Sequence, residues 1–187
     1  YAMIELENVT VRYGDRMVLD SLSMAISGTG CVAIQGASGI GKTTLLRVLA
    51  GLVLPQSGKV SGLGNRRVGV VFQEDRLLPW CTALENAAIA GDPQDAETYL
   101  SRLGLAGAEN MFPPELSGGM RRRVSIARAM VFSDDVLLLD EPFNGLDASC
   151  RMQVANALLA HAKLLIVVTH DAHDAELLNA QQHILLS

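Results

Sequence analysis

Cysteine is scarce in this chain of 187 residues, which contains only Cys31, Cys81 and Cys150. Their odd number and wide spacing exclude a disulfide framework, and no two of them stand at the short spacing of a zinc site. We therefore expect the chain to work in a reducing compartment.

Long apolar runs are also missing, since none approaches the roughly 20 residues that a membrane-spanning helix needs. The N-terminal residues lead directly into alternating polar and apolar positions, so we expect no signal peptide. The chain ends soon after its last expected strand, and we expect no appended regulatory domain.

Basic residues are in deficit, because 15 Lys and Arg stand against 20 Asp and Glu and give a formal net charge of −5. This balance argues against nucleic acid as a partner. Hydrophobic residues make up 49% of the chain and charged residues 19%, which is typical of a globular protein. The length is enough for one domain with a full core.

The clearest motif is GASGIGKTT, from Gly36 to Thr44, which matches the phosphate-binding pattern G-x-x-x-x-G-K-[ST]. An apolar strand-like run precedes it and a helical run follows it, as this loop requires. Glycines let the backbone wrap closely around an anion, and the helix presents its positive N-terminal end. We expect Lys42 to reach the β- and γ-phosphates and Thr43 to offer its hydroxyl to Mg²⁺. The expected phosphate-binding residues are Gly36, Ala37, Ser38, Gly39, Gly41, Lys42, Thr43 and Thr44.

Ahead of this loop, residues Ile4 to Tyr13 alternate apolar and polar side chains, which predicts a half-buried strand. Turn residues then lead into a second strand at 17–26, so the two are expected to form an antiparallel ribbon. After the phosphate-binding loop and its helix, residues 54–65 are expected to be a turn-rich connection.

Strands alternate with helices along the rest of the chain, which predicts an α/β fold with right-handed crossovers. We expect a P-loop NTPase with a mostly parallel sheet, an N-terminal antiparallel β subdomain and an inserted helical subdomain. The nucleotide-binding core is placed at 4–73 and 116–187, and the helical insertion at 74–115, within a single domain. The expected strands lie at 68–73, 136–142, 164–170 and 183–187, and the expected helices of the core lie at 116–130 and 147–162.

Two carboxylates, Asp140 and Glu141, follow four apolar residues of an expected strand. Ligands bind at the carboxyl ends of the strands in parallel α/β sheets. We expect Asp140 to hold Mg²⁺, directly or through water. Glu141 is expected to face the γ-phosphate and polarise the attacking water. The alternative is a strand that is merely capped by solvated acids.

Three further side chains, Gln73, His170 and Tyr13, also end expected strands. We expect the Gln73 amide oxygen to reach Mg²⁺ or the lytic water, and His170 to contact the γ-phosphate. Tyr13 is expected to stack on an adenine base, against the alternative of an ordinary strand aromatic. His173 lies close to His170, but without a third ligand it does not predict a metal site.

Together these motifs resemble those of the ATP-binding subunits of ABC transporters, over essentially the whole chain. GASGIGKTT is similar to the Walker A loop of that family, and VLLLDEP is similar to Walker B. Gln73 stands at the place of the Q-loop and His170 at that of the switch histidine. LSGGM, at 116–120, resembles the family signature, and NGLD, at 144–147, resembles the D-loop.

The resemblance implies that ATP and Mg²⁺ bind between two subunits arranged head to tail, the second being another copy or a related ATPase. Ser117, Gly118 and Gly119 of one subunit would cap the γ-phosphate held by the Walker A loop of the other. Asp147 would belong to the same shared site. A loop at a helix N-terminus suits an anion, and it cannot reach its own phosphate-binding loop without disrupting the sheet.

Two departures from the family pattern stand in these loops. Met120 replaces the usual glutamine after LSGG, and Asn144 replaces a serine or small residue at the start of the D-loop. Because Ser117, Gly119 and Asp147 are retained, we expect activity to survive.

The resemblance also implies a function, which is ATP hydrolysis that energises transmembrane permease subunits from the cytoplasmic face of the inner or plasma membrane. FQEDRLLPW, at 72–80, resembles importers of small anions or vitamins, so import is expected. One alternative is a soluble ABC-type ATPase that acts on ribosomes or DNA, which usually carries two ATPase units or a coiled-coil insertion. Another alternative is a P-loop kinase that transfers phosphate to a metabolite, and this hypothesis predicts that no LSGG loop is present.

The apolar stretch from Leu77 to Trp80 contains the only tryptophan and follows Gln73 closely. We expect part of it to be exposed as a groove for a short helix of the membrane partner. The alternative is that these side chains fill the small core of the insertion itself.

Overall fold

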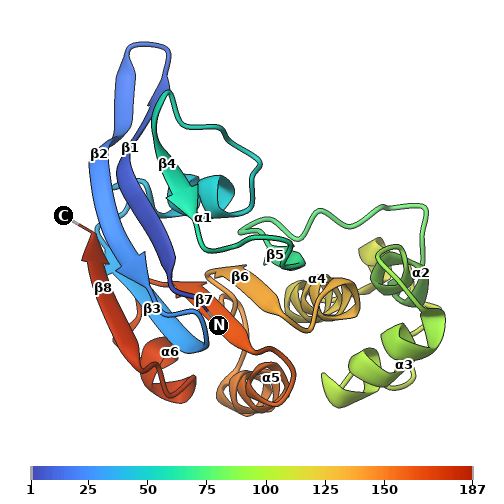
Figure 1. The fold of residues 1–187 in the computed structure, drawn as a ribbon. Helices are drawn as coiled ribbons and strands as arrows, with labels where there is room; N and C mark the ends of the chain where they lie inside the picture. Colours follow the sequence, from blue (N-terminus) through green and yellow to red (C-terminus); the bar gives the residue numbers. More distant parts are fainter. Residues whose placement is uncertain (1, 187) are drawn as a thin grey trace.

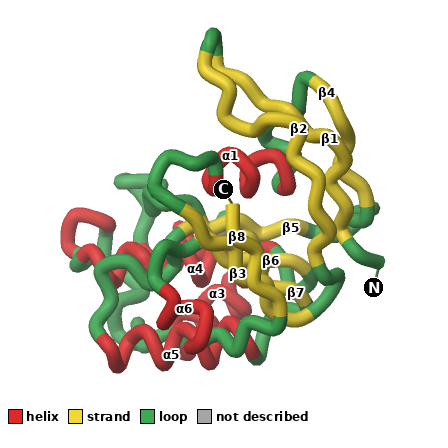
Figure 2. Tube along the Cα trace, turned by 90° about the vertical axis from the view of Figure 1, so that its left-hand side faces the viewer, coloured by secondary structure: helices red, strands yellow, loops and turns green. Residues whose placement is uncertain are grey.

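The computed structural model describes residues 2–186, which form a three-stranded sheet, a five-stranded sheet and helices packed against them (Figure 1). Figure 2 shows the layers of the molecule. The smaller sheet and α1 (Lys42–Leu49) lie on one side of the larger sheet, and most of the other helices lie on the opposite side.

The smaller sheet is antiparallel and confirms the expected ribbon. Ile4 pairs with Ile26 and Tyr13 with Arg16, so the first two strands run along each other over their full length. The strand order is β2 (Arg16–Ile26), β1 (Ile4–Tyr13) and β4 (Ser57–Ser61).

The expected turn-rich connection over 54–65 is wrong, because it contains β4, which pairs with β1. The sequence of β4 is short and polar, and only Val60 is even half-buried, so no hydrophobic alternation reveals it. Gly58 allows the two backbones to approach, since a Cβ at this position would lie 2.3 Å from the carbonyl oxygens of Glu7 and Asn8. The strand is therefore specified by its partner rather than by its own pattern.

The larger sheet is parallel throughout its four neighbouring pairs, which confirms the expected P-loop α/β fold. Three strands end earlier than expected, because β6 stops at Asp140, β5 stops before Gln73 and β7 stops before His170. Gln73 and His170 thus lie beyond their strands. Both side chains therefore lie on loops at the carboxyl edge of the sheet. The strand order is β5 (Val68–Val71), β6 (Val136–Asp140), β7 (Leu164–Val168), β3 (Gly30–Gly36) and β8 (Gln182–Leu186).

The central strand β6 shows how this sheet is buried. Val136 and Leu138 belong to the core beneath α1 and the smaller sheet, whereas Leu137 and Leu139 belong to the core on the opposite face. A strand that is covered on both faces has a continuous apolar sequence, and this is why the sequence identified it. Its last residue, Asp140, is buried and polar at the edge where a ligand would bind.

The remaining helices cover the second face of the parallel sheet. The helices of the expected insertion, α2 and α3, pack on α4 (Figure 1). Ala87 and Leu100 from the insertion share one buried core with Leu137 of the sheet, and the boundaries at 74 and 115 stay a prediction. The bounds are α2 (Ala83–Ala88), α3 (Pro93–Arg102), a 3₁₀ turn (Pro113–Glu115), α4 (Gly118–Phe132), α5 (Ala148–Leu159) and α6 (Ala172–Leu177).

Candidate functional site

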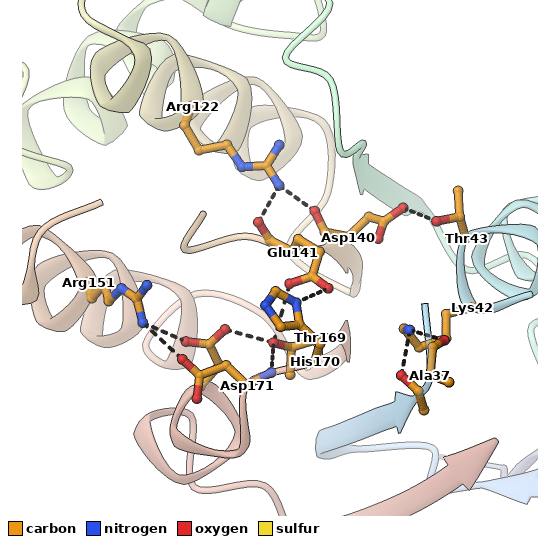
Figure 3. A network of polar contacts seen from close by, with 12 residues as sticks. Ala37, Lys42, Thr43, Arg122, Asp140, Glu141, Arg151, Thr169, His170 and Asp171 are labelled. Carbon is orange, nitrogen blue, oxygen red and sulfur yellow. Dashed lines mark hydrogen bonds and ion pairs between the residues drawn. The ribbon is translucent and has the colours of Figure 1, made fainter. Parts of the chain in front are cut away.

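The phosphate-binding loop joins the end of β3 to the start of α1. Gly41 precedes the helix with a φ of 110°, and a Cβ there would lie 2.9 Å from the Val18 carbonyl oxygen. The Lys42 ammonium donates to the carbonyl oxygens of Gly36 at 2.8 Å and Ala37 at 2.9 Å (Figure 3). The first turn of α1 has no acidic residue and no side-chain cap. Its N–H groups and Lys42 together form a positive end suited to an anion.

A hydroxyl and a carboxylate meet beside this loop. Thr43 Oγ1 donates to Asp140 Oδ2 at 2.7 Å (Figure 3), and Asp140 is only 3% exposed. Burial is the largest influence on Asp140 and raises the pKa of its carboxyl, while the hydrogen bond from Thr43 opposes the rise. A buried carboxylate of this kind gains from a bound cation.

This oxygen pair fits Mg²⁺. Magnesium sites that serve nucleotides use one or two protein oxygens and take their remaining ligands from water and phosphate. Within residues 2–186 no group of three or more His, Cys, Asp or Glu side chains is arranged to hold a metal by itself. Thr43 and Asp140 would therefore hold the ion together with the phosphates of the nucleotide.

Glu141 and His170 form a second pair at the same edge of the sheet. His170 Nδ1 lies 2.8 Å from Glu141 Oε1 (Figure 3). This hydrogen bond, followed by the charge of Glu141, raises the pKa of His170. The Glu141 backbone has a φ of 50°, in the left-handed region that residues with side chains seldom adopt and that is often found at functional sites. The carboxylate is thus held in a defined position next to a histidine.

A buried polar network behind this pair was not predicted from the sequence. Thr169 Oγ1 donates to Asp174 Oδ2 at 2.8 Å and lies 3.4 Å from Glu141 Oε2. Arg151 on α5 bonds to Asp174 Oδ1 at 3.2 Å and donates from Nε to the Leu146 carbonyl oxygen at 3.2 Å. The only indication of this network in the sequence is that Thr169 is adjacent to His170. The network connects the segment before α5 to the carboxylate of Glu141.

Ten of the predicted residues, from four parts of the chain, line one cleft of about 440 Å³, whereas Gly36 and Ala37 do not line it. Arg16 and Val18 also line it and were not predicted; their signal in the sequence was only their nearness to Tyr13. His170 lines an adjoining hollow together with Ser38, Lys42, Gln73 and Glu141. The predicted residues in the cleft are Tyr13, Ser38, Gly39, Gly41, Lys42, Thr43, Thr44, Gln73, Asp140 and Glu141.

The LSGG loop and Asp147 lie outside this cleft. Ser117 Oγ accepts from the Met120 N–H at 3.2 Å and so caps α4. Gly118 and Gly119 line a neighbouring hollow, which shares only Gln73 with the cleft. Asp147 caps α5 by accepting from the Cys150 N–H at 2.9 Å. Within one chain, these residues and the phosphate-binding loop do not form a common site.

The departure at position 120 has a structural explanation. The Met120 side chain is partly buried and packs against the core that lies between the sheet and the helices. Its backbone N–H still donates to Ser117. The replacement therefore leaves the cap at the start of α4 intact. Asn144 lines the hollow around His170.

Comparison with known proteins shows close relatives along nearly the whole chain. Residues 19–144 match the family model described as ABC transporter. An aliphatic sulfonates import ATP-binding protein (SsuB 1) of Rhodococcus jostii is 42% identical, over 94% of this chain and 76% of the relative. A second such protein (SsuB 3), of Paraburkholderia xenovorans, is also 42% identical, over 92% of this chain and 72% of the relative.

Two solved structures of similar fold are dimeric cassettes. The ATP-binding cassette MJ0796, in a dimeric post-hydrolysis state bound to ADP and Pi, has a TM-score of 0.87 and 28% identity, covering 98% of this chain and 94% of that one. A second dimeric structure of the same bacterial cassette has a TM-score of 0.86 and 29% identity, with the same coverage. The chain therefore belongs to the ABC transporter family, as an ATP-binding subunit that hydrolyses ATP and uses Mg²⁺.

Proposed function

We propose that this chain powers the import of a small organic anion, of the alkyl sulfonate class, by hydrolysing MgATP between two ATPase subunits. The proposal rests on the observation that the residues expected at one ATP site lie in two different places on the chain. Lys42, Asp140 and Glu141 line one cleft, while Gly118 and Gly119 of the LSGG loop line a neighbouring hollow that shares only Gln73 with it. The substrate class is supported by the relatives, which are import proteins for aliphatic sulfonates.

Each residue of the cleft has a separate role in the proposed reaction. Lys42 and the N–H groups at the start of α1 bind phosphate, and Thr43 with Asp140 holds Mg²⁺, which would neutralise charge on the phosphates. Glu141 orients the attacking water and accepts its proton. His170 fixes the Glu141 carboxylate through the 2.8 Å hydrogen bond. Gln73, on the loop after β5, reaches the same cleft and would sense whether the ion and water are present.

The second half of each site would come from another copy of the chain. Ser117 and Gly118 begin α4, whose N-terminal end is a suitable place for the γ-phosphate of the partner's ATP. The dimeric state of the similar cassettes supports this arrangement. Asp147 begins α5 in the same way and would lie at the dimer contact. ATP would therefore join the two subunits, and hydrolysis would release them.

We further propose that the chain is attached to the cytoplasmic face of the membrane through permease subunits. Among residues 2–186, none of the helices is both long enough and apolar enough to span a bilayer. The similarity to import proteins favours this location over a soluble ATPase without a transport partner. Co-purification with a membrane protein would separate the two alternatives.

The loop that follows Gln73 presents the docking surface that we propose for the permease. Leu77 packs partly against the core, whereas Trp80 is 72% exposed. The buried Asn86 side chain holds this loop, since it accepts from the Leu78 N–H at 2.7 Å and donates to the carbonyl oxygens of Leu78 and Cys81. A rigid loop with an exposed tryptophan is typical of a binding hot spot.

Leu78→Asp and Trp80→Ala are expected to separate docking from catalysis. Because Trp80 is exposed and Leu78 is only half-buried, both variants should keep their fold and their basal ATPase rate. Association with the permease and ATP-driven uptake should fall, by about tenfold or more for the tryptophan. Pull-down with the membrane subunits and uptake by reconstituted vesicles would measure these losses.

The matched control is Leu54→Asp, because Leu54 is an equally apolar and more exposed residue, at 82%, in the loop between α1 and β4. It should leave both association and uptake unchanged. Unaltered uptake in the Leu78 and Trp80 variants, or loss of their fold, would show that the loop serves the core of the insertion instead.

A further inference from the structure

Arg122 is 3% exposed, which makes it as enclosed as Asp140, and no sequence pattern indicated a role for it. It lies on α4, a little over one turn after the Ser117 cap. On one side its guanidinium reaches the end of β6. It donates from Nη2 to the carbonyl oxygens of Asp140 and Glu141, the latter at 2.7 Å (Figure 3), and from Nε to that of Pro142 at 3.3 Å.

On its other side the same guanidinium reaches the end of β5. Arg122 Nη1 donates to the Phe72 carbonyl oxygen and lies 3.4 Å from that of Gln73. It also lies 3.5 Å from Asp75 Oδ1. β5 and β6 are neighbouring strands. One side chain thus bridges the two backbone segments that carry Gln73 and Glu141.

Only arginine has the donors for this arrangement. Its planar fork carries five N–H groups in fixed directions, whereas lysine concentrates its charge at one point and cannot reach both segments. Burial lowers the pKa of Arg122, and the charges of Asp75, Asp140 and Glu141 oppose that effect. A charge is costly to bury unless its partners are well placed. The partners here are mainly backbone carbonyls, so the side chain defines where the backbone lies.

We propose that Arg122 is a positioning residue for hydrolysis, which holds Gln73 and Glu141 in one arrangement and ties both to the helix that begins at the LSGG loop. The inference rests on the proposed function of this cleft. Because α4 carries Arg122 and Ser117 on one continuous helix, a shift of the LSGG loop against a partner subunit would be transmitted to both backbone segments. The residue therefore connects the loop offered to the partner with the chain's own catalytic carboxylate.

Arg122→Lys tests this proposal against a matched control at the other end of the same strands. Arg66 precedes β5, and its side chain is only 9% exposed. Its guanidinium donates to the Gly28 carbonyl oxygen at 2.9 Å and pairs with Asp135 at 3.1 Å. Arg66→Lys should lower the melting temperature while kcat stays within about twofold. Arg122→Lys should lower kcat by about tenfold or more with little change in the Kd for MgATP, since small displacements of catalytic groups are costly.

Equal losses of stability in the two variants, with kcat preserved in both, would overturn the proposal and make Arg122 a purely structural residue. If Arg122→Lys does not fold, Asp75→Asn decides the question. Asp75 contacts the Arg122 guanidinium but lies outside β5 and β6. The Asp75→Asn variant should therefore fold, and its kcat should fall about threefold. An unchanged kcat in Asp75→Asn would then refute the proposal. An inactive wild-type chain would instead refute the proposed function.

Discussion

Glu141→Gln is expected to lower the ATPase rate by about a hundredfold or more, while binding of MgATP stays nearly normal. The amide keeps the size of the carboxylate and can still bond to His170, but it cannot accept a proton from water. The geometry supports this assignment because Glu141 lines the cleft and its carboxylate is fixed by His170 Nδ1 at 2.8 Å. Steady-state hydrolysis and equilibrium binding of a fluorescent nucleotide would measure the two effects.

A matched control is available on α6. Glu176 lies 3.4 Å from His173 in an exposed pair of the same chemical kind, away from the cleft. Glu176→Gln should therefore leave the rate unchanged. Near-normal turnover in Glu141→Gln would remove this residue from the catalytic role and return it to the alternative of a solvated acid at the end of a strand.

A mixture of Lys42→Ala and Ser117→Arg chains is expected to recover activity that each lacks alone. Lys42→Ala removes the phosphate-binding charge from its own cleft, and Ser117→Arg blocks the loop that serves the partner. In a mixed dimer, one site then has an intact loop of each kind and the other site carries both lesions. If all pairings form equally, the mixture should reach about a quarter of the wild-type rate, because half of the dimers carry one intact site of two.

The control for this mixture pairs Lys42→Ala with a chain that carries both substitutions, since that combination leaves no intact site. It should remain inactive at every ratio. An absence of recovery in the first mixture, together with a rate that is linear in subunit concentration on dilution, would contradict the shared site. Recovery in the control would show that Lys42 is not needed, because both of its chains lack this lysine.

The groups that we propose to bind phosphate and metal could be predicted from the sequence, because their spacing within the chain determines their geometry. The loop from Gly36 to Thr43 is local, and Asp140 and Glu141 follow a strand whose burial on both faces leaves a continuous apolar run. Both features can be recognised from residues that lie close together in the sequence. Their meeting at the carboxyl edge of the sheet then follows from the parallel arrangement.

The features that the sequence did not reveal depend on contacts between distant residues. β4 has no alternation of its own and exists through its pairing with β1. Arg122 stands among three consecutive arginines, and only the packing of α4 against β5 and β6 distinguishes it from its neighbours. Thr169 and Asp174 form a buried hydrogen bond whose connection to Arg151 spans two helices. No pattern of neighbouring residues in the sequence indicates such contacts.

The position of the LSGG loop, by contrast, was expected from the sequence, because this loop cannot reach its own phosphate-binding loop without disrupting the sheet. Its chemistry is evident from Ser117 and two glycines at the start of a helix, and in the structure the hollow lined by Gly118 and Gly119 shares only Gln73 with the chain's own cleft. That separation is the structural reason to place ATP between two copies of the chain.

The mass of Glu141→Gln in solution, measured by sedimentation equilibrium with MgATP and then with MgADP, tests this claim most directly. A chain of 20.0 kDa that cannot complete hydrolysis should be held by MgATP as a dimer of twice that mass and should return to a monomer in MgADP. A single-chain mass at saturating MgATP would contradict the shared site.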